Sequence, residues 1–215
     1  YDRYDRIGGL LMYGIPGFKL EKSIVERRGQ LLIDGGVHFH LGVDIGGETR
    51  FANIRSKHDA ILVATGVYEA RDIAAPGSGL DGIVPALEYL TVSNRKSLGD
   101  DVMAFDSGAL NAEGKDVVVI GGGDTAMDCV RTAIRQKAKS VSCLYRRDRA
   151  NMPGSQREVQ NAEEEGVVFK WLSAPQAFLG DDKVRAVQAQ RIHLGQPDIT
   201  GRQVPEVIDG SAHEL

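Results

Sequence analysis

The clearest pattern of apolar and polar positions begins near residue 115. Residues 117–120 are consecutive aliphatic side chains, as expected for a parallel strand covered on both faces. After a glycine-rich turn, apolar residues between positions 126 and 134 recur at helical spacing. A second apolar strand is expected at residues 140–145. The pattern therefore predicts a strand–helix–strand unit built on a parallel sheet.

The turn between the first strand and the helix has the composition of a dinucleotide-binding turn. Gly121 and Gly123 stand where the chain must turn sharply and let a pyrophosphate approach, and Ala126 is the small residue at the helix–strand contact. The free N–H groups of a helix N-terminus favour phosphate, and Asp124 or Thr125 is expected to cap this helix. A purely structural glycine turn is the alternative. The position of the glycine turn between a strand and a helix favours the dinucleotide interpretation.

Two arginines at the end of the second strand indicate which dinucleotide is bound. Arg146 and Arg147 stand where an NAD site usually has an acidic residue for the ribose hydroxyls. Guanidinium groups instead suit the 2′-phosphate of NADPH. Either arginine could be a solvated surface charge, but we expect at least one to contact phosphate, with Arg149 a weaker third candidate. The sequence therefore predicts a preference for NADPH over NADH.

The remaining pattern predicts further elements of an α/β fold. Helices are expected at residues 20–34, 51–57, 85–94 and 155–166, the last with a capping box formed by Ser155 and Glu158. Strands are expected at residues 37–43, 59–66 and 167–172, followed by antiparallel strands at 183–194 and 204–208. Residues 97–114 lack a clear period and predict a long surface segment. The glutamates at 163–165 are expected on a solvated face.

The most plausible domain boundary is the Pro-Gly-Ser-Gly stretch at residues 76–79. It divides the chain into residues 1–75 and residues 76–215. The first part ends its predicted strand at 59–66 with Ala64, Thr65 and Gly66, small residues that would let the backbone pass close to a ligand.

Composition limits the class of protein. The chain has 215 residues, of which 42% are hydrophobic and 26% charged, as in a globular protein. The net charge of −4 gives no support for nucleic-acid or membrane binding, and no apolar run reaches the ~20 residues of a membrane helix. Cys129 and Cys143 are predicted as reduced core residues, which fits a cytoplasmic protein. His38 and His40 share a face of a predicted strand, but no further metal ligand is evident.

Four stretches carry a resemblance to a known family. They are YDRYDRIGGLLMYGIPGFKLEK, ILVATGVYEARDIAAPG, VVVIGGGDTAMDCVRTAIRQ and CLYRRDRANMPGSQREVQNAEEEG. With them the chain resembles the small (beta) subunit of bacterial NADPH-dependent glutamate synthase, over essentially its whole length. The resemblance implies a Rossmann-like NADPH-binding domain with a central parallel sheet and an antiparallel strand extension. It also implies an incomplete piece of a second, FAD-binding Rossmann-like domain.

The resemblance also implies residue roles. The residues expected along FAD are Asp2, Gly9, Leu10, Lys19 and Val43, with Val43 near the adenine. The expected NADPH contacts are Gly122, Gly123, Asp124, Thr125, Arg146 and Arg147. The stretch Ala64-Thr65-Gly66 resembles a strand-end motif near the junction of the two domains.

The implied activity is hydride transfer from NADPH to FAD. Electrons would then pass through 4Fe-4S clusters to the large (alpha) subunit, where glutamine and 2-oxoglutarate give glutamate. No side-chain catalyst is expected, because the cofactors carry this chemistry. Two alternatives stay open: a related NADPH oxidoreductase subunit with another acceptor, as in dihydropyrimidine dehydrogenase, and a non-catalytic NADP(H)-binding module.

The chain departs from the family pattern in several respects. It contains neither the first flavin motif nor the cysteine-rich iron–sulfur segment, and it does not begin with Met. We therefore expect a piece of a longer protein that binds NADPH better than FAD and is inactive alone. In addition, Lys137 replaces the usual glycine after the helix, which costs roughly 1 kcal/mol if that position is left-handed.

Overall fold

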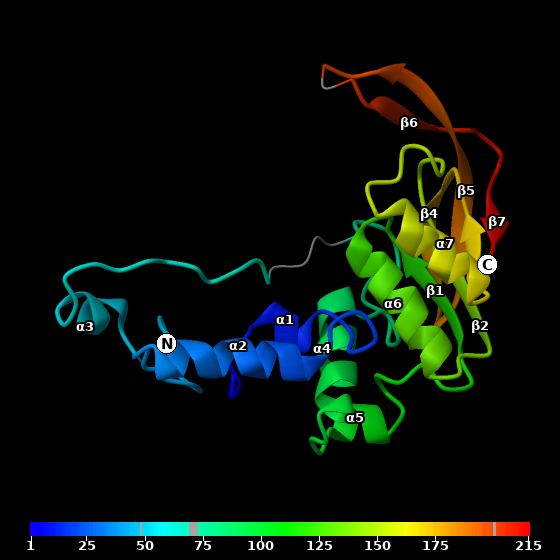
Figure 1. The fold of residues 1–215 in the computed structure, drawn as a ribbon. Coiled ribbons are helices and arrows are strands. Elements are labelled where there is room, and N and C mark those ends of the chain that lie inside the picture. Colours follow the sequence, from blue (N-terminus) through cyan, green and yellow to red (C-terminus); the bar gives the residue numbers. More distant parts are fainter. Residues whose placement is uncertain (48, 69–72, 200) are drawn as a thin grey trace.

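The computed structural model describes residues 1–47, 49–68, 73–199 and 201–215. Its helices and strands combine a packed α/β body with an extended N-terminal part (Figure 1). In chain order they are α1 (Leu10–Tyr13), α2 (Lys22–Asp34), α3 (Phe51–Arg55), α4 (Ala86–Ser97), α5 (Met103–Asp106), β1 (Asp116–Ile120), α6 (Asp124–Arg135), β2 (Ser140–Leu144), α7 (Gln156–Glu164), β3 (Val168–Lys170), β4 (Ser173–Gly180), β5 (Val184–Pro197), β6 (Gln203–Val207) and β7 (His213–Glu214).

The parallel sheet has the strand order β1-β2-β3. β1 pairs in register with β2, with Val119 opposite Cys143, and β2 pairs with β3. Each crossover between these strands contains a helix, α6 after β1 and α7 after β2. The predicted strand–helix–strand unit is therefore confirmed, and the third strand gives the order of one half of a doubly wound sheet.

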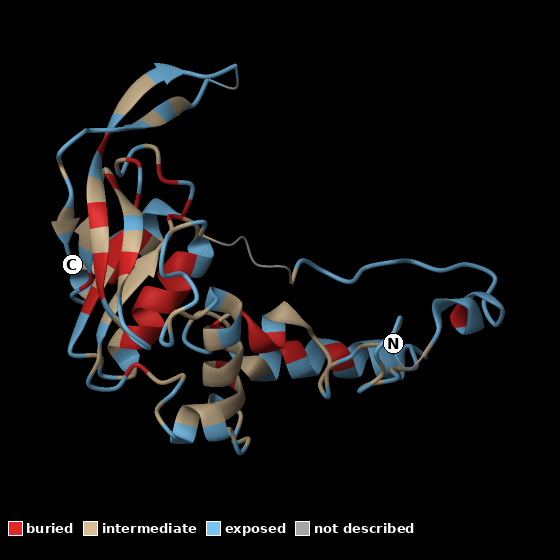
Figure 2. Cartoon of the chain, turned by 180° about the vertical axis from the view of Figure 1, so that it is seen from behind, coloured by how far each residue is buried: buried red, intermediate tan, exposed pale blue. Residues whose placement is uncertain are grey.

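The core of the body lies where α6 packs against this sheet. Val130 and Ala133 on α6 are fully buried, and they meet Val141 and Cys143 of β2 in one apolar cluster. Figure 2 shows this concentration of buried residues over the sheet and α6. Burying a valine side chain contributes roughly 1.5–3 kcal/mol, so the predicted apolar stripe of α6 fixes the helix on the sheet. Both cysteines are free and buried.

The antiparallel extension has the order β4-β5-β6, with β7 paired to β5. The predicted pair at residues 183–194 and 204–208 is confirmed as β5 and β6, with Ile192 opposite Val207. β4 and β7 were not predicted. Pro175 and Gly180 interrupt the sequence pattern of β4, and β5 supplies the pairing that makes it a strand. Phe178 of β4 packs in a cluster with Leu144 at the end of β2, so the two sheets share apolar contacts.

The N-terminal part begins with two helices. The predicted helix at 20–34 is confirmed as α2, and Met12, Tyr13 and Val25 form a small buried cluster with it. This cluster contacts α4, where the buried Asn94 donates its Nδ2 hydrogen bond to the carbonyl of Tyr13 at 2.9 Å. Among the described helices, none has the length and apolar character needed to cross a membrane.

Two predicted strands in this part are wrong. Residues 37–43 and 59–66 belong to no sheet of the described structure. The first segment has scattered backbone partners: the N–H of Val37 donates to Leu32, and near its end the N–H of Asp2 donates to His40 and that of Gly42 to Tyr4. A strand requires neighbours for its backbone groups, and within the described structure residues 59–66 form no backbone hydrogen bond. Leu62 in this second segment is 89% exposed. Both segments thus have an apolar sequence typical of strands, but no sheet of the described structure includes them.

Several local predictions also fail. The N-cap of α6 is Gly123, and neither it nor the N-cap of α7 forms a side-chain cap bond. The carboxylate of Glu158, expected in a capping box, instead binds Arg131 at 2.6 Å. Glu165 binds Arg131 at 2.7 Å, so the prediction that this glutamate lies on a solvated face is also wrong. Tertiary ion pairs have replaced the local hydrogen bonds that the sequence pattern suggested.

Candidate dinucleotide-binding site

The glycine turn connects the end of β1 to the start of α6. Gly121 has a φ of 149°, which favours glycine, and its N–H donates to the carbonyl of Leu144. Gly122 is buried, and a Cβ placed on it would lie under 3.0 Å from three ring carbons of Tyr145. A Cβ placed on Gly123 would meet no atom within 4 Å. One side of the turn is therefore packed against protein and the other is open.

The N-terminus of α6 presents donors on the open side. The carbonyl of Gly123 accepts from the N–H groups of Ala126 and Met127. Within the described residues, the N–H groups of Asp124 and Thr125 have no protein acceptor, as is usual in the first turn of a helix. Together with the positive end of the helix dipole, these groups suit a bound phosphate.

A second turn supports the glycine turn from beside it. The N–H of Gly154 donates to the carbonyl of Gly122 at 3.0 Å. The carboxylate of Asp124 accepts from the N–H of Ser155 at 3.0 Å. The Tyr145 hydroxyl donates to the carbonyl of Asn151. The local sequence does not indicate that residues 151–154 lie at this site, because a sequence pattern does not show what a turn packs against.

The three candidate arginines have different environments. Arg146 is exposed and, within the described part of the chain, forms no hydrogen bond or ion pair. Arg147 is only 7% exposed, and its Nε donates to the carbonyl of Gln203 at 3.2 Å. Arg149 forms an ion pair with Glu163 at 2.7 Å. Arg146 is thus the guanidinium that is free to meet an added phosphate, whereas Arg147 joins β2 to the β5–β6 hairpin.

The candidate FAD residues assemble only in part. The N–H of Val43 donates to the carbonyl of Asp2 at 2.9 Å, and the Asp2 carboxylate accepts from the N–H of Tyr4. Gly9, with a φ of 51°, precedes Leu10 at the start of α1. A Cβ on Gly9 would lie 3.6 Å from the Tyr68 hydroxyl, and one on Gly66 would lie 3.1 Å from the same side chain. Asp2 and Val43 thus meet each other, and Gly9 and Gly66 both border Tyr68. Ala64 and Thr65 are exposed beside Gly66.

Lys19 lies apart from the other candidate FAD residues. Its Nζ is 2.7 Å from Asp128 on α6 and 3.5 Å from Glu158 on α7. Burial alone would lower the pKa of Lys19, but the hydrogen bond and charge of Asp128 raise it overall. Lys19 therefore stays protonated and joins the N-terminal part to the helices of the body.

Close to Lys19, Phe18 adds a second contact between the two parts. The guanidinium of Arg135 lies 3.8 Å from the centroid of the Phe18 ring, and Arg131 lies 4.8 Å from it. Glu165 binds both guanidinium groups. This cluster cannot be inferred from the local sequence pattern, because the acidic partners of Arg131 and Arg135 come from α7 and the residue that follows it.

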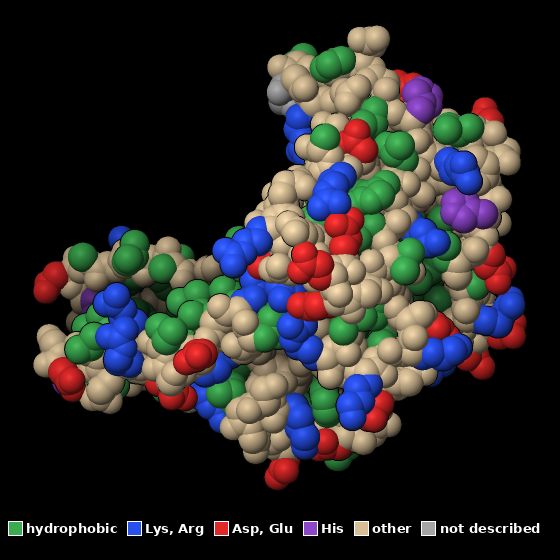
Figure 3. Space-filling model, turned by 45° about the vertical axis from the view of Figure 1, so that its right-hand side comes forward, with side chains coloured by type: hydrophobic (Ala, Val, Ile, Leu, Met, Phe, Trp, Pro, Cys, Tyr) green, Lys and Arg blue, Asp and Glu red, His purple; other side chains and the backbone are tan. Residues whose placement is uncertain are grey.

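Charges of both signs are interspersed on the face shown in Figure 3. Among the described residues, no group of three or more His, Cys, Asp or Glu side chains could hold a metal ion. His40 stacks on the ring of Tyr1, with centroids 4.6 Å apart. The candidate site therefore consists of an open glycine turn with free backbone donors and of Arg146, which has no described partner, beside candidate FAD residues that assemble only in part.

A parallel sheet, an open glycine turn and an arginine beyond the next strand define a dinucleotide-binding protein of the Rossmann type. The family model described as pyridine nucleotide-disulphide oxidoreductase matches residues 22–199. The chain belongs to this family of FAD- and NAD(P)-dependent oxidoreductases.

Individual relatives make the likeness more specific. The chain is 68% identical to the glutamate synthase [NADPH] small chain of Azospirillum brasilense, over 98% of this chain and 44% of the relative. It is 44% identical to the small chain of Escherichia coli K12, over 99% of this chain and 45% of the relative. The chain thus spans less than half the length of these two relatives, and the resemblance inferred from its motifs is confirmed.

A solved structure supports the fold. FprA of Mycobacterium tuberculosis in complex with NADPH matches with a TM-score of 0.81 at 18% sequence identity, over 100% of this chain and 61% of that chain. At this identity the likeness concerns the fold alone. The α/β prediction with parallel and antiparallel sheets is confirmed.

Proposed function

We propose that this chain is the NADPH-binding part of a glutamate synthase small subunit. The observation that carries the proposal is the 68% identity to a glutamate synthase [NADPH] small chain. The open glycine turn supports it, because the turn offers the backbone donors that a pyrophosphate needs.

The residues of the turn fit NADPH. The pyrophosphate would lie against the open side of Gly123, where the N–H groups of Asp124 and Thr125 are free. Gly121, Gly122 and Ala126 shape the turn and the helix contact behind it. Arg146 would hold the 2′-phosphate by charge-assisted hydrogen bonds. Arg147 positions the strand end from which Arg146 projects.

Residues 1–75 would contribute to an FAD-binding domain, and residues 76–215 would form the NADPH-binding domain. Asp2, Gly9, Leu10 and Val43 would lie along FAD, with Ala64, Thr65 and Gly66 near the junction. Figure 3 shows hydrophobic side chains on the surface of the N-terminal part. In this part of the chain, Leu62 and Val63 are 89% and 67% exposed. Side chains of this kind suit a strand with neighbours on both sides, which supports a flavin domain completed by further chain.

In the intact protein, bound NADPH would supply a hydride and FAD would accept it. The described residues would bind and orient the dinucleotide. Lys19 and Phe18 would hold the flavin part against α6 and α7 through Asp128 and the Arg131–Arg135 pair. Electrons would continue through 4Fe-4S clusters to a large subunit in the cytoplasm, for glutamate synthesis from glutamine and 2-oxoglutarate.

The arginines provide a test of the NADPH site. In the intact protein, Arg146→Ala is expected to weaken NADPH binding by ~1.5–3 kcal/mol, the value of a hydrogen bond to a charged group, and to leave NADH binding unchanged. Arg149→Ala is the matched control, because Arg149 is already paired with Glu163. Both affinities can be measured by fluorescence titration. Equal losses for NADPH and NADH would contradict the assignment of Arg146.

The activity needs its own test. Anaerobic addition of NADPH to the flavin-loaded intact protein should bleach the flavin absorbance faster than NADH does. Glutamate formation from glutamine and 2-oxoglutarate should then require the large subunit. If NADPH reduces the flavin but no glutamate is formed, the result would support the NADPH site and contradict the proposed electron acceptor.

A further inference from the structure

The loop that carries Arg146 is held in place by residues other than Arg146. This arginine follows the end of β2, is exposed, and forms no hydrogen bond or ion pair within the described residues. A free guanidinium binds a phosphate well only if its backbone is already held in place, because the entropy of ordering the loop is otherwise lost on binding. The residues that fix this loop therefore contribute to the choice between NADPH and NADH.

Asn151 closes the loop after Arg146. The carboxylate of Asp148 accepts from the backbone N–H of Asn151 at 2.9 Å and from its side-chain Nδ2 at 2.8 Å. Two hydrogen bonds to one carboxylate oxygen hold residues 148–151 in a tight turn. Arg146 lies two residues before this turn, so the position of its backbone depends on the turn.

The same asparagine contacts two further parts of the body. Its carbonyl accepts from the Tyr145 hydroxyl at 3.3 Å, and the Tyr145 ring lies against Gly122 of the glycine turn. Its Nδ2 also donates to Gln203 Oε1, at 3.4 Å, at the start of β6. The half-buried Asn151 therefore joins the Arg146 loop both to the glycine turn and to the β5–β6 hairpin.

We propose that Asn151 is a positioning residue that makes the dinucleotide site select a 2′-phosphate. Through Asp148 it fixes the turn beyond Arg146, and through Tyr145 it ties that turn to the glycine turn. The arginine and the free N–H groups at the start of α6 are thus held as one unit, which lets one dinucleotide bind both. Asn151 acts through Arg146 and needs no contact with the dinucleotide. The inference rests on the proposed function, because it concerns the phosphate that Arg146 would bind.

The test compares the affinities of the intact protein for NADPH and NADH by fluorescence titration. Asn151→Ala removes the side-chain hydrogen bonds and keeps the backbone ones. We expect the affinity for NADPH to fall about three- to tenfold, within the range for a single hydrogen bond, and the affinity for NADH to stay unchanged. The ratio of the two affinities does not depend on the fraction of folded protein, so a purely structural effect would leave it unchanged.

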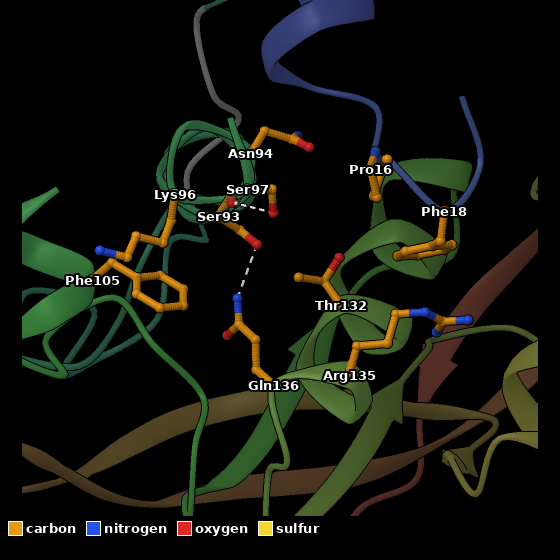
Figure 4. A pocket seen from close by; sticks show the side chains of 11 residues that line it. Pro16, Phe18, Ser93, Asn94, Lys96, Ser97, Phe105, Thr132, Arg135 and Gln136 are labelled. Atoms are coloured by element: carbon orange, nitrogen blue, oxygen red, sulfur yellow. Dashed lines mark hydrogen bonds between the residues drawn. The ribbon is translucent and has the colours of Figure 1, made fainter. Parts of the chain in front are cut away.

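Gln136→Ala is the matched control. Gln136 is also a half-buried carboxamide that joins separate elements: its Nε2 donates to the Ser93 hydroxyl at 2.9 Å, and its Oε1 accepts from the Tyr89 hydroxyl and the N–H of Ala112. Figure 4 shows this side chain reaching toward α4 from the C-terminal end of α6, whereas the glycine turn lies at the N-terminal end. Gln136→Ala should therefore lower the stability in urea unfolding and leave the affinity ratio unchanged. A ratio lowered as much as in Asn151→Ala would overturn the inference.

A double-mutant cycle with Arg146→Ala tests whether Asn151 acts through the arginine. In the Arg146→Ala background, Asn151→Ala should not lower the affinity ratio further, because the group that it positions is absent. A further fall in that background would overturn the inference. So would an unchanged ratio in Asn151→Ala alone.

The same measurements separate this inference from the proposed function. If Arg146→Ala lowers the affinity ratio and Asn151→Ala does not, the inference alone fails. If Arg146→Ala leaves the ratio unchanged, the assignment of Arg146 fails and the inference fails with it. Should Asn151→Ala not fold, Gln203→Ala removes only the hydrogen bond at 3.4 Å and should lower the ratio about twofold. An unchanged ratio in Gln203→Ala would then overturn the inference.

Discussion

Alanine substitutions at Gly122 and Gly123 are expected to have different effects, although the two glycines are neighbours in one turn. A Cβ on Gly122 would lie under 3.0 Å from three carbons of the Tyr145 ring. That ring is buried, its hydroxyl is bonded to Asn151, and its edge lies against Trp171. Overpacking of this kind costs about 1–3 kcal/mol. We therefore expect Gly122→Ala to lower the melting temperature by about 4–8 °C, for a loss of about 2 kcal/mol.

At Gly123 the same methyl group meets no protein atom within 4 Å. The residue has a φ of −93°, which alanine adopts without strain. Because alanine is a poorer N-cap than glycine, the loss of stability should stay below about 1 kcal/mol. The added methyl would instead occupy the approach of the pyrophosphate. We expect NADPH to bind at least about tenfold more weakly, a change of ~1.4 kcal/mol.

Two measurements on the intact protein separate these effects. Urea unfolding gives the change in stability, and fluorescence titration gives the NADPH affinity. In a double-mutant cycle, Gly122→Ala combined with Tyr145→Leu should recover at least about 1 kcal/mol, since the two sites are in contact. A Gly122→Ala protein as stable as the unmodified one would refute the packing argument. Unchanged NADPH affinity in Gly123→Ala would refute the placement of the pyrophosphate.

Two further substitutions test the charges and the backbone. Hydrogen bonds from Arg135, then those from Arg131, lower the pKa of Glu165 from 4.5 to about 2. Because its folded-state pKa is depressed, Glu165 stabilises the protein above pH 4.5, and this contribution is lost as the pH falls toward 2. Glu165→Gln should cost about 2–3 kcal/mol at neutral pH, allowing for the exposure of Arg135, and should flatten the acid dependence of urea unfolding between those values. Lys137 has a φ of 63°, so Lys137→Gly should stabilise the protein by about 1 kcal/mol. Thermal unfolding of Lys137→Gly checks this, with Lys137→Ala as a control that should gain nothing.

Sequence reasoning was most successful where local pattern and tertiary environment agree. Residues 117–120 are apolar on both faces, and β1, an edge strand of the described sheet, has Val117 and Val119 in one apolar cluster and Val118 and Ile120 in another. Lys137 adopts the left-handed conformation for which the sequence predicts a cost. Reasoning failed at residues 37–43 and 59–66, whose apolar sequence is typical of strands. A strand is defined by its neighbours, and in the described structure neither segment pairs with a neighbouring strand.

The candidate site shows the same division. The order of strand, glycine turn and helix follows from the spacing of small and apolar residues, and so does the position of an arginine pair beyond the next strand. The spacing does not show which of the two arginines is free to bind a phosphate. Arg147 is buried because β6 brings the carbonyl of Gln203 to it from 56 residues further along the chain, whereas Arg146 projects outward.

For this protein, then, the sequence by itself determined the dinucleotide turn and its family, because both depend on residues close together along the chain. Only the tertiary structure decided that Tyr145 closes one side of the turn and leaves the other open. It also decided that Lys19 and Glu158 bind residues of α6, and that the buried Thr132 hydroxyl has no hydrogen-bond partner among the described residues. The physical reason is that burial and pairing depend on groups that the fold brings together from distant positions.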